Sequence, residues 1–386
     1  MADNNENKVL NVPHLRFPEF SGEWEEHTLS EYLEFKNGLN PDAKRIGSGL
    51  PFISVMDILS EGVINYDNIR GKVNATEKEI ECFGVKDGDL LFQRSSETLE
   101  DVGRANVYMD NRTAIYGGFV IRGRKIGNYD PLFFKYLLAT PLARKRTCRM
   151  GAGAQHFNIG QEGLSKISLY FPSIEEQRKI AEFLSLIDER IATQNKIIDK
   201  LQSLIKGIGN DVFGKLRKDI GLNAKVGDVL SYEQPQPYIV EDTEYTAGGT
   251  PVLTANKAFV LGYTSETDGI YDKGDCIIFD DFTLDCKYVD FPFKVKSSAI
   301  KILTAKNKEL LRYTFEFLKY LDLSTDEHKR HYIAETQKQE FILPTTQIVR
   351  TIAHAFSTLS SRMQTIVKQR DMLELQKQYL LRQMFI

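Results

Sequence analysis

Few cysteines, no membrane-length apolar run and no secretion signal restrict the class of this protein. The four cysteines are Cys82, Cys148, Cys276 and Cys286, and their spacing fits neither a disulfide framework nor a zinc site. No apolar run approaches the roughly 18 residues that a membrane-spanning helix needs. The N-terminus MADNNENKVLN is polar throughout. We therefore expect reduced thiols, a cytoplasmic location and no membrane partner.

The sequence also lacks a strong charge of either sign. It has 50 Lys and Arg against 53 Asp and Glu, for a net charge of −3. A nucleic-acid partner would therefore have to be attracted by local basic patches and not by the charge of the whole chain. The length of 386 residues and the hydrophobic content of 42% are enough for two or three domains with their own cores.

Motifs for nucleotide or cofactor chemistry are missing as well. There is no GxxxxGK[ST] phosphate loop, so ATP is not expected to bind in that way. The nearest match to the Asx-Pro-Pro-aromatic motif of amino-methyltransferases is residues 130–133, DPLF, which lack the second proline and follow no glycine-rich cofactor loop. Proline there is ordinary at a helix start. We expect no cofactor in this chain.

An acidic cluster leaves one enzymatic alternative open. Asp285-Cys286-Lys287 follows Asp275, Asp280 and Asp281, and it faintly resembles the carboxylate and lysine site of restriction nucleases, in which carboxylates hold Mg²⁺. The charged rim of a hairpin would give the same pattern. The alternative is a self-sufficient, Mg²⁺-dependent endonuclease with this cluster as its site.

The most regular feature is a heptad rhythm that begins at Ser173 and ends at Phe213. Apolar residues alternate spacings of four and three, which is typical of a coiled-coil seam, with Gln194 filling one gap. Pro172 and a capping pair of Ser173 and Glu176 mark the start. The seam residues are Ile180, Leu184, Ile187, Ile191, Ile198, Leu201, Ile205, Ile208 and Val212.

The same rhythm returns 172 residues later, from Ile352 to Met384. Sequence before it is repeated too, since GDLLF at 88–92 is echoed by GDCII at 274–278. The chain therefore reads as two copies of one plan. Two such helices in one chain can close on each other antiparallel, and we expect Ile208 to lie opposite Phe356.

These patterns predict an α+β protein with an internal pseudo-two-fold repeat. Two similar mixed α/β domains are separated by two long antiparallel coiled-coil helices. The expected divisions are a disordered tail at 1–12, a first domain at 13–172, a central helix at 173–214, a second domain at 215–344 and a C-terminal helix at 345–386.

Each half places basic residues close to a polar loop, which favours binding over catalysis. Asn and Gln can make a two-point contact to adenine, and Arg to guanine. A plain surface role would fit any single one of these residues, but the combination occurs in both halves. The candidates for DNA contact are Arg94, Ser95, Arg104, Asn106, Arg146, Arg149, Gln155, His156, Asn158, Thr254, Asn256, Lys287, Lys329, Arg330 and His331.

Four stretches carry a resemblance to a known family. They are RFPEFSGEWEEHTLSEYLEF at 16–35, PFISVMDI at 51–58, GDLLFQRSS at 88–96 and FPSIEEQRKIAEFLSLIDERI at 171–191. With them the chain resembles the specificity subunit of type I restriction-modification systems. The second copy departs from the last stretch, because Ile348 and Val349 stand where Glu176 and Gln177 would be.

The resemblance implies a non-catalytic DNA-binding subunit. One target-recognition domain would read each half of a split site, and the helices would set the gap between the halves. Two modification subunits carrying S-adenosylmethionine would methylate adenine, and restriction subunits would use ATP and Mg²⁺ to cut unmodified DNA. The residues expected to bind partner subunits are Glu176, Gln177, Arg178, Glu182, Glu189, Arg190 and Lys196. A coiled-coil scaffold that never touches DNA is the other alternative.

Overall fold

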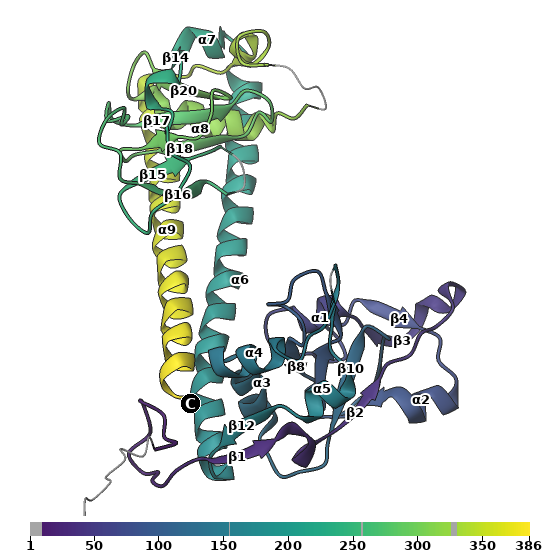
Figure 1. Cartoon of the computed structure of the whole chain (residues 1–386). Helices are drawn as coiled ribbons and strands as arrows, with labels where there is room; N and C mark the ends of the chain where they lie inside the picture. The colour runs from purple at the N-terminus through teal and green to yellow at the C-terminus, as the bar shows by residue number, and fades with distance from the viewer. Residues whose placement is uncertain (1–9, 154, 256–257, 326–329) are drawn as a thin grey trace, which may run out of the picture. The chain divides into compact units, whose positions relative to one another are not determined.

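The computed structural model describes residues 10–153, 155–255, 258–325 and 330–386, which form two compact units (Figure 1). The first unit contains residues 1–193 and 369–386, and the second contains residues 194–368. Each unit therefore combines a globular part with pieces of the two long helices. Of the tail expected to be disordered, residues 1–9 lie outside the described residues. Asn11, by contrast, accepts a hydrogen bond of 2.8 Å from the Trp24 amide.

The long helices are α6 (Ile174–Asp219) and α9 (Thr346–Gln383), with 46 and 38 residues. In each unit the segments of α6 and α9 lie side by side and run in opposite directions (Figure 1). In the first unit Lys377 Nζ lies 2.5 Å from Asp188 Oδ1. In the second unit the Phe356 ring packs over Gly209, one residue from the expected partner Ile208.

The first unit contains two four-stranded sheets. One has the order β2-β10-β6-β8 and is antiparallel, and the other has the order β4-β3-β9-β5 with β3 and β9 parallel. Two short pairs, β1 with β12 and β7 with β11, complete it. The strands are β1 (Glu25–Thr28), β2 (Leu33–Asn37), β3 (Ile46–Ile53), β4 (Gly71–Val73), β5 (Gly84–Val85), β6 (Leu90–Gln93), β7 (Ser95–Ser96), β8 (Ala105–Val107), β9 (Ala114–Tyr116), β10 (Val120–Lys125), β11 (Phe157–Asn158) and β12 (Ser168–Phe171).

The helices of the first unit are α1 (Val55–Ile58), α2 (Glu77–Phe83), α3 (Pro131–Ala139), α4 (Pro141–Cys148) and α5 (Gln161–Ser165). Asp130 and Thr140 cap α3 and α4, and a proline follows each cap. Proline at this place has no amide to leave unpaired, and its fixed φ suits a helix start. The proline of the DPLF stretch therefore belongs to a helix start, as the sequence indicates.

The second unit has a four-stranded antiparallel sheet of order β14-β20-β17-β18 and a three-stranded sheet of order β16-β15-β19, with β15 and β19 parallel. A short pair joins β13 to β21. The elements are β13 (Ala224–Lys225), α7 (Val226–Val229), β14 (Leu230–Glu233), β15 (Thr250–Leu253), β16 (Val260–Thr264), β17 (Cys276–Asp280), β18 (Cys286–Val289), β19 (Lys294–Val295), β20 (Ile300–Ala305), α8 (Leu310–Leu321) and β21 (Glu340–Phe341).

An aromatic core joins the first globular part to its helix segments. Trp24, Phe133 and Phe385 are all buried, and the Phe133 and Phe385 rings stack with their centroids 5.4 Å apart. Trp24 meets Phe385 edge to face at 6.2 Å. Large aromatic side chains contribute much of the apolar area that folding buries. Phe385, which follows α9, is therefore part of the core of the first unit, together with Leu380 of the last turn of that helix.

A buried ion pair holds the N-terminal segment to the start of α6. Arg16 Nε and Nη2 donate to the two carboxylate oxygens of Glu176 at 2.8 and 2.7 Å, and Glu176 is 1% exposed. Ser173 Oγ accepts from the Glu176 amide at 3.4 Å, but the Glu176 carboxylate pairs with Arg16 and does not cap the helix. A two-point Arg–carboxylate pair is the strong form of this interaction.

The neighbouring Gln177 is also internal. Its Oε1 accepts from the Asp130 amide at 3.1 Å, and its Nε2 donates to the Pro172 carbonyl at 3.1 Å. The expectation that Glu176 and Gln177 bind a partner subunit is therefore wrong, because both side chains are buried and hydrogen-bonded within the chain. Glu176 attaches the N-terminal segment to α6 through Arg16, and Gln177 attaches the start of α3 to α6 through the Asp130 amide.

Removal of Arg16 should destabilise the first unit strongly. An Arg16→Ala variant leaves the Glu176 carboxylate buried without its cation, which typically costs about 3–5 kcal/mol. The matched control is Lys179→Ala, which breaks an exposed pair with Glu19 at 3.6 Å and should change stability by less than about 1 kcal/mol. Urea unfolding measures both. Equal effects of the two substitutions would contradict the buried pair.

Candidate nucleic-acid interface

The first unit brings two separate polar stretches together at one edge. Strand β7 pairs with β11, so that Ser95 lies opposite Asn158, and the Ser95 hydroxyl donates to Asn158 Oδ1. Ala152 and Asn158 exchange two backbone hydrogen bonds of 2.9 Å. The glycine-rich loop at 151–158 is therefore closed on itself and fixed beside the segment that follows β6.

Arg94 lies at the centre of this edge, between two other segments. Its amide donates to the Phe119 carbonyl at 2.9 Å, and its carbonyl accepts from the Ile159 amide at 3.0 Å. Its Nη1 also donates to the Gly118 carbonyl at 3.3 Å. Neighbouring hydrogen-bonded strands are about 4.8 Å apart. Phe119 and the glycine-rich loop therefore flank Arg94 within about 5 Å on either side.

Phe119 is a member of this edge that the sequence reasoning missed. Its side chain is 68% exposed, at the end of a turn between β9 and β10 in which the Val120 amide donates to the Gly117 carbonyl at 2.9 Å. A signal was present in the sequence, since a Gly-Gly pair between two apolar strands indicates a tight turn. We define the reading edge as Arg94, Ser95, Phe119 and residues 155–158.

The predicted residues of the reading edge differ in what they can offer a ligand. Gln155 and His156 are exposed, and so is Arg149 just before the loop. The amide of Asn158 is already used on both sides, because Oδ1 accepts from Ser95 and Nδ2 donates to the His156 carbonyl at 3.3 Å. Asn158 therefore holds the loop together, and Gln155 and His156 are better placed for contact.

Two further predicted residues of the first unit, Arg104 and Asn106, have different outcomes. Arg104 is exposed and pairs with Asp101 at 2.6 Å. Asn106 is 1% exposed, and its side chain bonds the Ile58 carbonyl at 3.3 Å and the Val107 amide at 2.9 Å. The prediction of a DNA contact for Asn106 is therefore wrong, because its side chain completes the backbone hydrogen bonds of the core.

Arg146 is committed to the fold as well. Its Nη1 lies 2.7 Å from Glu26 Oε1 and also donates to the Ser168 carbonyl, so it ties α4 to the β1 and β12 pair. The hydrogen bond from Arg146 lowers the pKa of Glu26 below its usual value. The guanidinium is stacked over the Tyr170 ring at 5.3 Å. Arg146 is thus a structural link between elements.

The second unit places its predicted residues less closely together. Thr254 is half-buried, and its amide donates to the Phe259 carbonyl at 3.0 Å, while Arg330 is exposed. His331 is 1% exposed and its Nδ1 lies 2.9 Å from Glu335. The prediction of a DNA contact for His331 is wrong because its side chain is buried. Asn256 and Lys329 lie outside the described residues.

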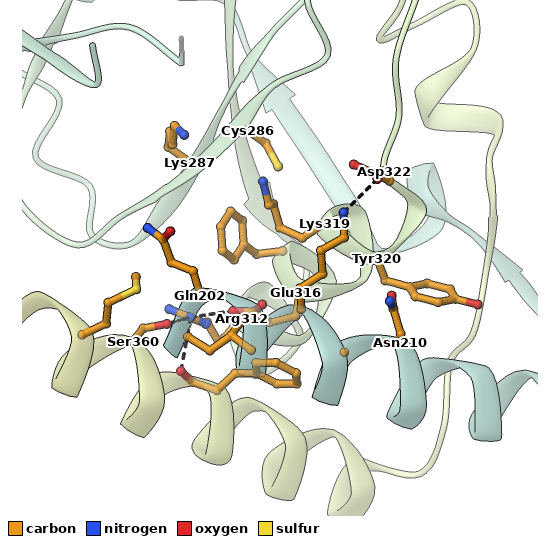
Figure 2. Close-up of a pocket in the computed structure, with 16 residues that line it drawn as sticks. Gln202, Asn210, Cys286, Lys287, Arg312, Glu316, Lys319, Tyr320, Asp322 and Ser360 are labelled. Atoms are coloured by element: carbon orange, nitrogen blue, oxygen red, sulfur yellow. Dashed lines mark hydrogen bonds and ion pairs between the residues drawn. The ribbon is translucent and has the colours of Figure 1, made fainter. Parts of the chain in front are cut away.

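Lys287 lines a pocket of about 410 Å³ within the second unit, between α8 and the segments of the two long helices (Figure 2). Arg312 crosses it and donates to Ser360 Oγ and, at 3.4 Å, to the Phe356 carbonyl. Beside Arg312, burial raises the pKa of the Glu316 carboxyl. Among the residues that line the pocket, Arg312 is the one that these hydrogen bonds show attaching α8 to α9.

The acidic cluster that suggested a nuclease serves the fold. Asp280 Oδ1 accepts from the Phe282 and Thr283 amides, both at 2.9 Å. Asp281 is 1% exposed, accepts from the Tyr332 amide at 2.7 Å and lies 3.5 Å from Lys301 Nζ. In residues 10–153, 155–255, 258–325 and 330–386, no three His, Cys, Asp or Glu side chains gather as metal ligands would. The endonuclease alternative has no support from this geometry.

Comparison with known proteins identifies a family domain at residues 21–203. Residues 21–203 match the model of the type I restriction modification DNA specificity domain. This part of the chain is a type I specificity domain. The resemblance read from the sequence is thereby confirmed there. The specificity domain contains the reading edge and the start of α6, up to residue 203.

Individual relatives agree with this family. The specificity subunit of the type I restriction enzyme EcoR124I/EcoR124II from Escherichia coli is 45% identical over 126 residues, 31% of each chain. The putative MjaX specificity subunit from Methanocaldococcus jannaschii is 26% identical over 214 residues, 54% of this chain and 49% of that protein. The chain thus spans less than half the length of these curated relatives.

A solved structure extends the likeness of fold beyond the specificity domain. The S subunit of a type I restriction-modification system from M. genitalium has a TM-score of 0.63 at 15% identity, covering 97% of this chain and 99% of that one. At this identity the likeness establishes the fold alone. No helix in the described part of the chain has both the length and the apolar character to cross a membrane.

The outer faces of the long helices combine the expected charged residues with an apolar group. Arg178, Glu182, Glu189, Arg190 and Lys196 of α6 are exposed, as expected for side chains turned away from the seam. On α9, however, Met372, Leu375 and Tyr379 are 68%, 65% and 60% exposed. Their spacing of three and four puts them on one face of the helix. The sequence reasoning missed this apolar group because it considered only charged residues.

The loop of the specificity domain should depend on Gly153. Its φ is +145°, and a Cβ there would lie 1.9 Å from the His156 carbonyl oxygen, so Gly153→Ala must distort the loop. Strain of about 1–3 kcal/mol should raise hydrogen exchange of the Asn158 amide by roughly tenfold or more. Gly160→Ala is the control, since a Cβ meets nothing there within 4 Å. Unchanged exchange in the first variant would contradict the closed loop.

Proposed function

We propose that this chain is the specificity subunit of a type I restriction-modification complex and that it reads a bipartite DNA site. The observation that carries the proposal is the reading edge within the specificity domain. Exposed Gln155, His156 and Arg149 are of the types that bond base edges and phosphates. They are held by a backbone frame that does not depend on them. Each globular part, at 13–172 and 215–344, is a target-recognition domain for one half-site.

Backbone hydrogen bonds support a repeat of one domain plan. The Gly117 amide donates to the Ile53 carbonyl at 3.0 Å, and the Lys296 amide donates to Leu253 at 3.1 Å. The Arg94 amide donates to Phe119, and the Asp281 amide donates to Ala299, both at 2.9 Å. The sheets β2-β10-β6-β8 and β14-β20-β17-β18 also share one topology. In both, the four strands, counted along the chain, lie in the order first, fourth, second, third. We infer a pseudo-two-fold repeat with a different set of side chains on each copy.

The long helices act as the spacer in this proposal. At about 1.5 Å per residue, the 38 residues of α9 extend over roughly 57 Å. An antiparallel coiled coil of that size can separate two recognition surfaces by about one turn of DNA, on the order of 34 Å. The gap between half-sites is then set by helix length, and the half-site sequences by the domains.

Catalysis is supplied by other subunits in this proposal. Two modification subunits that bind S-adenosylmethionine flip out and methylate one adenine in each half-site. Restriction subunits hydrolyse ATP and cut with Mg²⁺. The chain itself holds no cofactor and binds double-stranded DNA. Its near-neutral charge is compatible with this role because the partner subunits can contribute phosphate contacts.

The test is to sequence methylated adenines in a strain with and without this chain, together with its modification subunits. A bipartite motif should be methylated only when the chain is present. The purified chain with Mg²⁺ should leave plasmid DNA intact, which separates this function from the endonuclease. A complex that shows no sequence-dependent methylation or DNA binding would reject the proposal and favour a scaffold.

We further propose that the apolar face of α9, formed by Met372, Leu375 and Tyr379, binds a modification subunit together with exposed charges of α6. Apolar groups of this exposure are uncommon on a surface that stays in water and are enriched at interfaces. Glu182, Arg190 and the other exposed charges fit the polar rim of such an interface.

A charge placed on this face should weaken assembly. Leu375→Asp should reduce co-purification of the modification subunit by tenfold or more, because an unpaired carboxylate would be buried in the interface, at a cost of about 1–3 kcal/mol. Ser361→Asp introduces the same charge at an exposed position of α9 that lies eleven residues before Met372, outside the apolar face, and should have little effect. Equal loss in both variants, or none in either, would place the contact elsewhere.

A further inference from the structure

The side chain at the end of the turn between β9 and β10 has no assigned role, and its chemistry differs from the rest of the reading edge. Phe119 is 68% exposed, although exposure of a phenyl ring to water is unfavourable. Its neighbour across the backbone bond, Arg94, is polar, and the loop beyond Arg94 exposes Gln155 and His156. An apolar group is thus held at one end of a polar edge.

The fold does not require an aromatic residue at this position. In the second unit the corresponding carbonyl belongs to Ala299, which accepts from the Asp281 amide at the same 2.9 Å. The turn there runs from Ser297 to Ile300, with the Ile300 amide donating to the Ser297 carbonyl at 3.5 Å. Because alanine occupies the same place in the same frame, Phe119 is not explained by the needs of the turn.

The turn that carries Phe119 is fixed in position before any ligand binds. A Cβ on Gly118 would lie 1.8 Å from Asn40 Oδ1, and a Cβ on Gly117 would lie 3.0 Å from the Phe52 ring. The turn is therefore packed tightly against Asn40 and Phe52 on one side and bonded to Arg94 on the other. A side chain on such a support loses little freedom on binding, which favours affinity.

We propose that Phe119 contacts the C5-methyl group of a thymine in the half-site read by the first domain. Within the major groove the thymine methyl is the apolar group that distinguishes one base pair from another, and phenylalanine is among the side chains that contact it. The residues beside Phe119 suit the polar edges of neighbouring bases. This inference rests on the proposed function and specifies one of its contacts.

The matched position in the second domain makes the contact asymmetric. Ala299 and the three residues before it offer a short and mainly polar turn. The half-site read by the second domain should therefore lack a contact of this size at the equivalent place. The two half-sites are predicted to differ in their sensitivity to loss of thymine methyl groups.

The experiment measures DNA binding by the complex of the full chain with its modification subunits. Duplexes carry the site found by methylation sequencing, with each thymine of the first half-site replaced in turn by deoxyuridine, which lacks the methyl group. For the wild-type chain one replacement should weaken binding about fourfold, the effect expected for one buried methyl group. Phe119→Ala should weaken binding to the natural duplex on the order of tenfold.

The decisive result is the combination of the two changes. With Phe119→Ala, the same deoxyuridine should cause no further loss, because the methyl group has lost its partner. Ile126→Ala is the control: this side chain is 59% exposed in the same unit but lies outside the reading edge, and the variant should behave like the wild type. Thermal unfolding should be nearly unchanged for both variants.

Two other outcomes separate the inference from the function on which it rests. If Phe119→Ala weakens binding while the deoxyuridine effect persists, the ring acts in another way, for example by insertion between bases, and the thymine contact is rejected. If the wild type discriminates between sites but no deoxyuridine matters, the contact is also rejected and the proposed function stands. A wild-type complex without sequence preference rejects both.

Discussion

Burial of the heptad seam is the interaction on which the structure depends. Ile180, Leu184 and Ile187 are at most 6% exposed and pack in one core with Leu380 of α9 and with Met384, which follows that helix. Burial of each such side chain contributes about 1.5–3 kcal/mol, whereas an exposed ion pair on the same helix contributes about 0–1 kcal/mol. A few seam positions therefore outweigh all the surface charges of α6. The globular parts are attached to this seam through α3 and α8, whose buried faces complete the two cores.

The long helices could be predicted from the sequence because heptad periodicity depends only on residues that are close together in the chain. The roles of single polar residues were not, because burial depends on residues far away in the chain. Glu176 pairs with Arg16 across 160 positions, and the Asn106 amide bonds the Ile58 carbonyl across 48 positions. In the sequence, a polar residue that hydrogen-bonds a distant buried group cannot be distinguished from a polar residue that is exposed and can bind a ligand. His331 was misread for the same reason, since its burial comes from tertiary packing.

The reading edge could be predicted only in part. Arg94-Ser95 and the glycine-rich loop were identified by composition, and β7 with β11 brings them together. Which side chains point outward was not predictable, because that depends on strand register. Asn158 was expected to read a base, but its opposite Ser95 and its own loop use both ends of its amide. Phe119 was overlooked because apolar residues near strands are assigned to the core by default, and only the turn geometry exposes this one.

The hydrogen bonds of Arg94 and Asp281 explain how such a frame can carry different surfaces. In both places the amide of the residue after the central strand bonds the last residue of a turn, so the bond uses backbone atoms alone. The side chains are then free to differ. Arg94 is half-buried, and its amide bonds the carbonyl of the exposed Phe119. Asp281 is buried near Lys301, and its amide bonds the carbonyl of Ala299. Because the backbone bonds supply the support, substitution at the turn alters what the surface offers without removing the contacts that hold it. Surface chemistry and fold stability are thereby separated at this position.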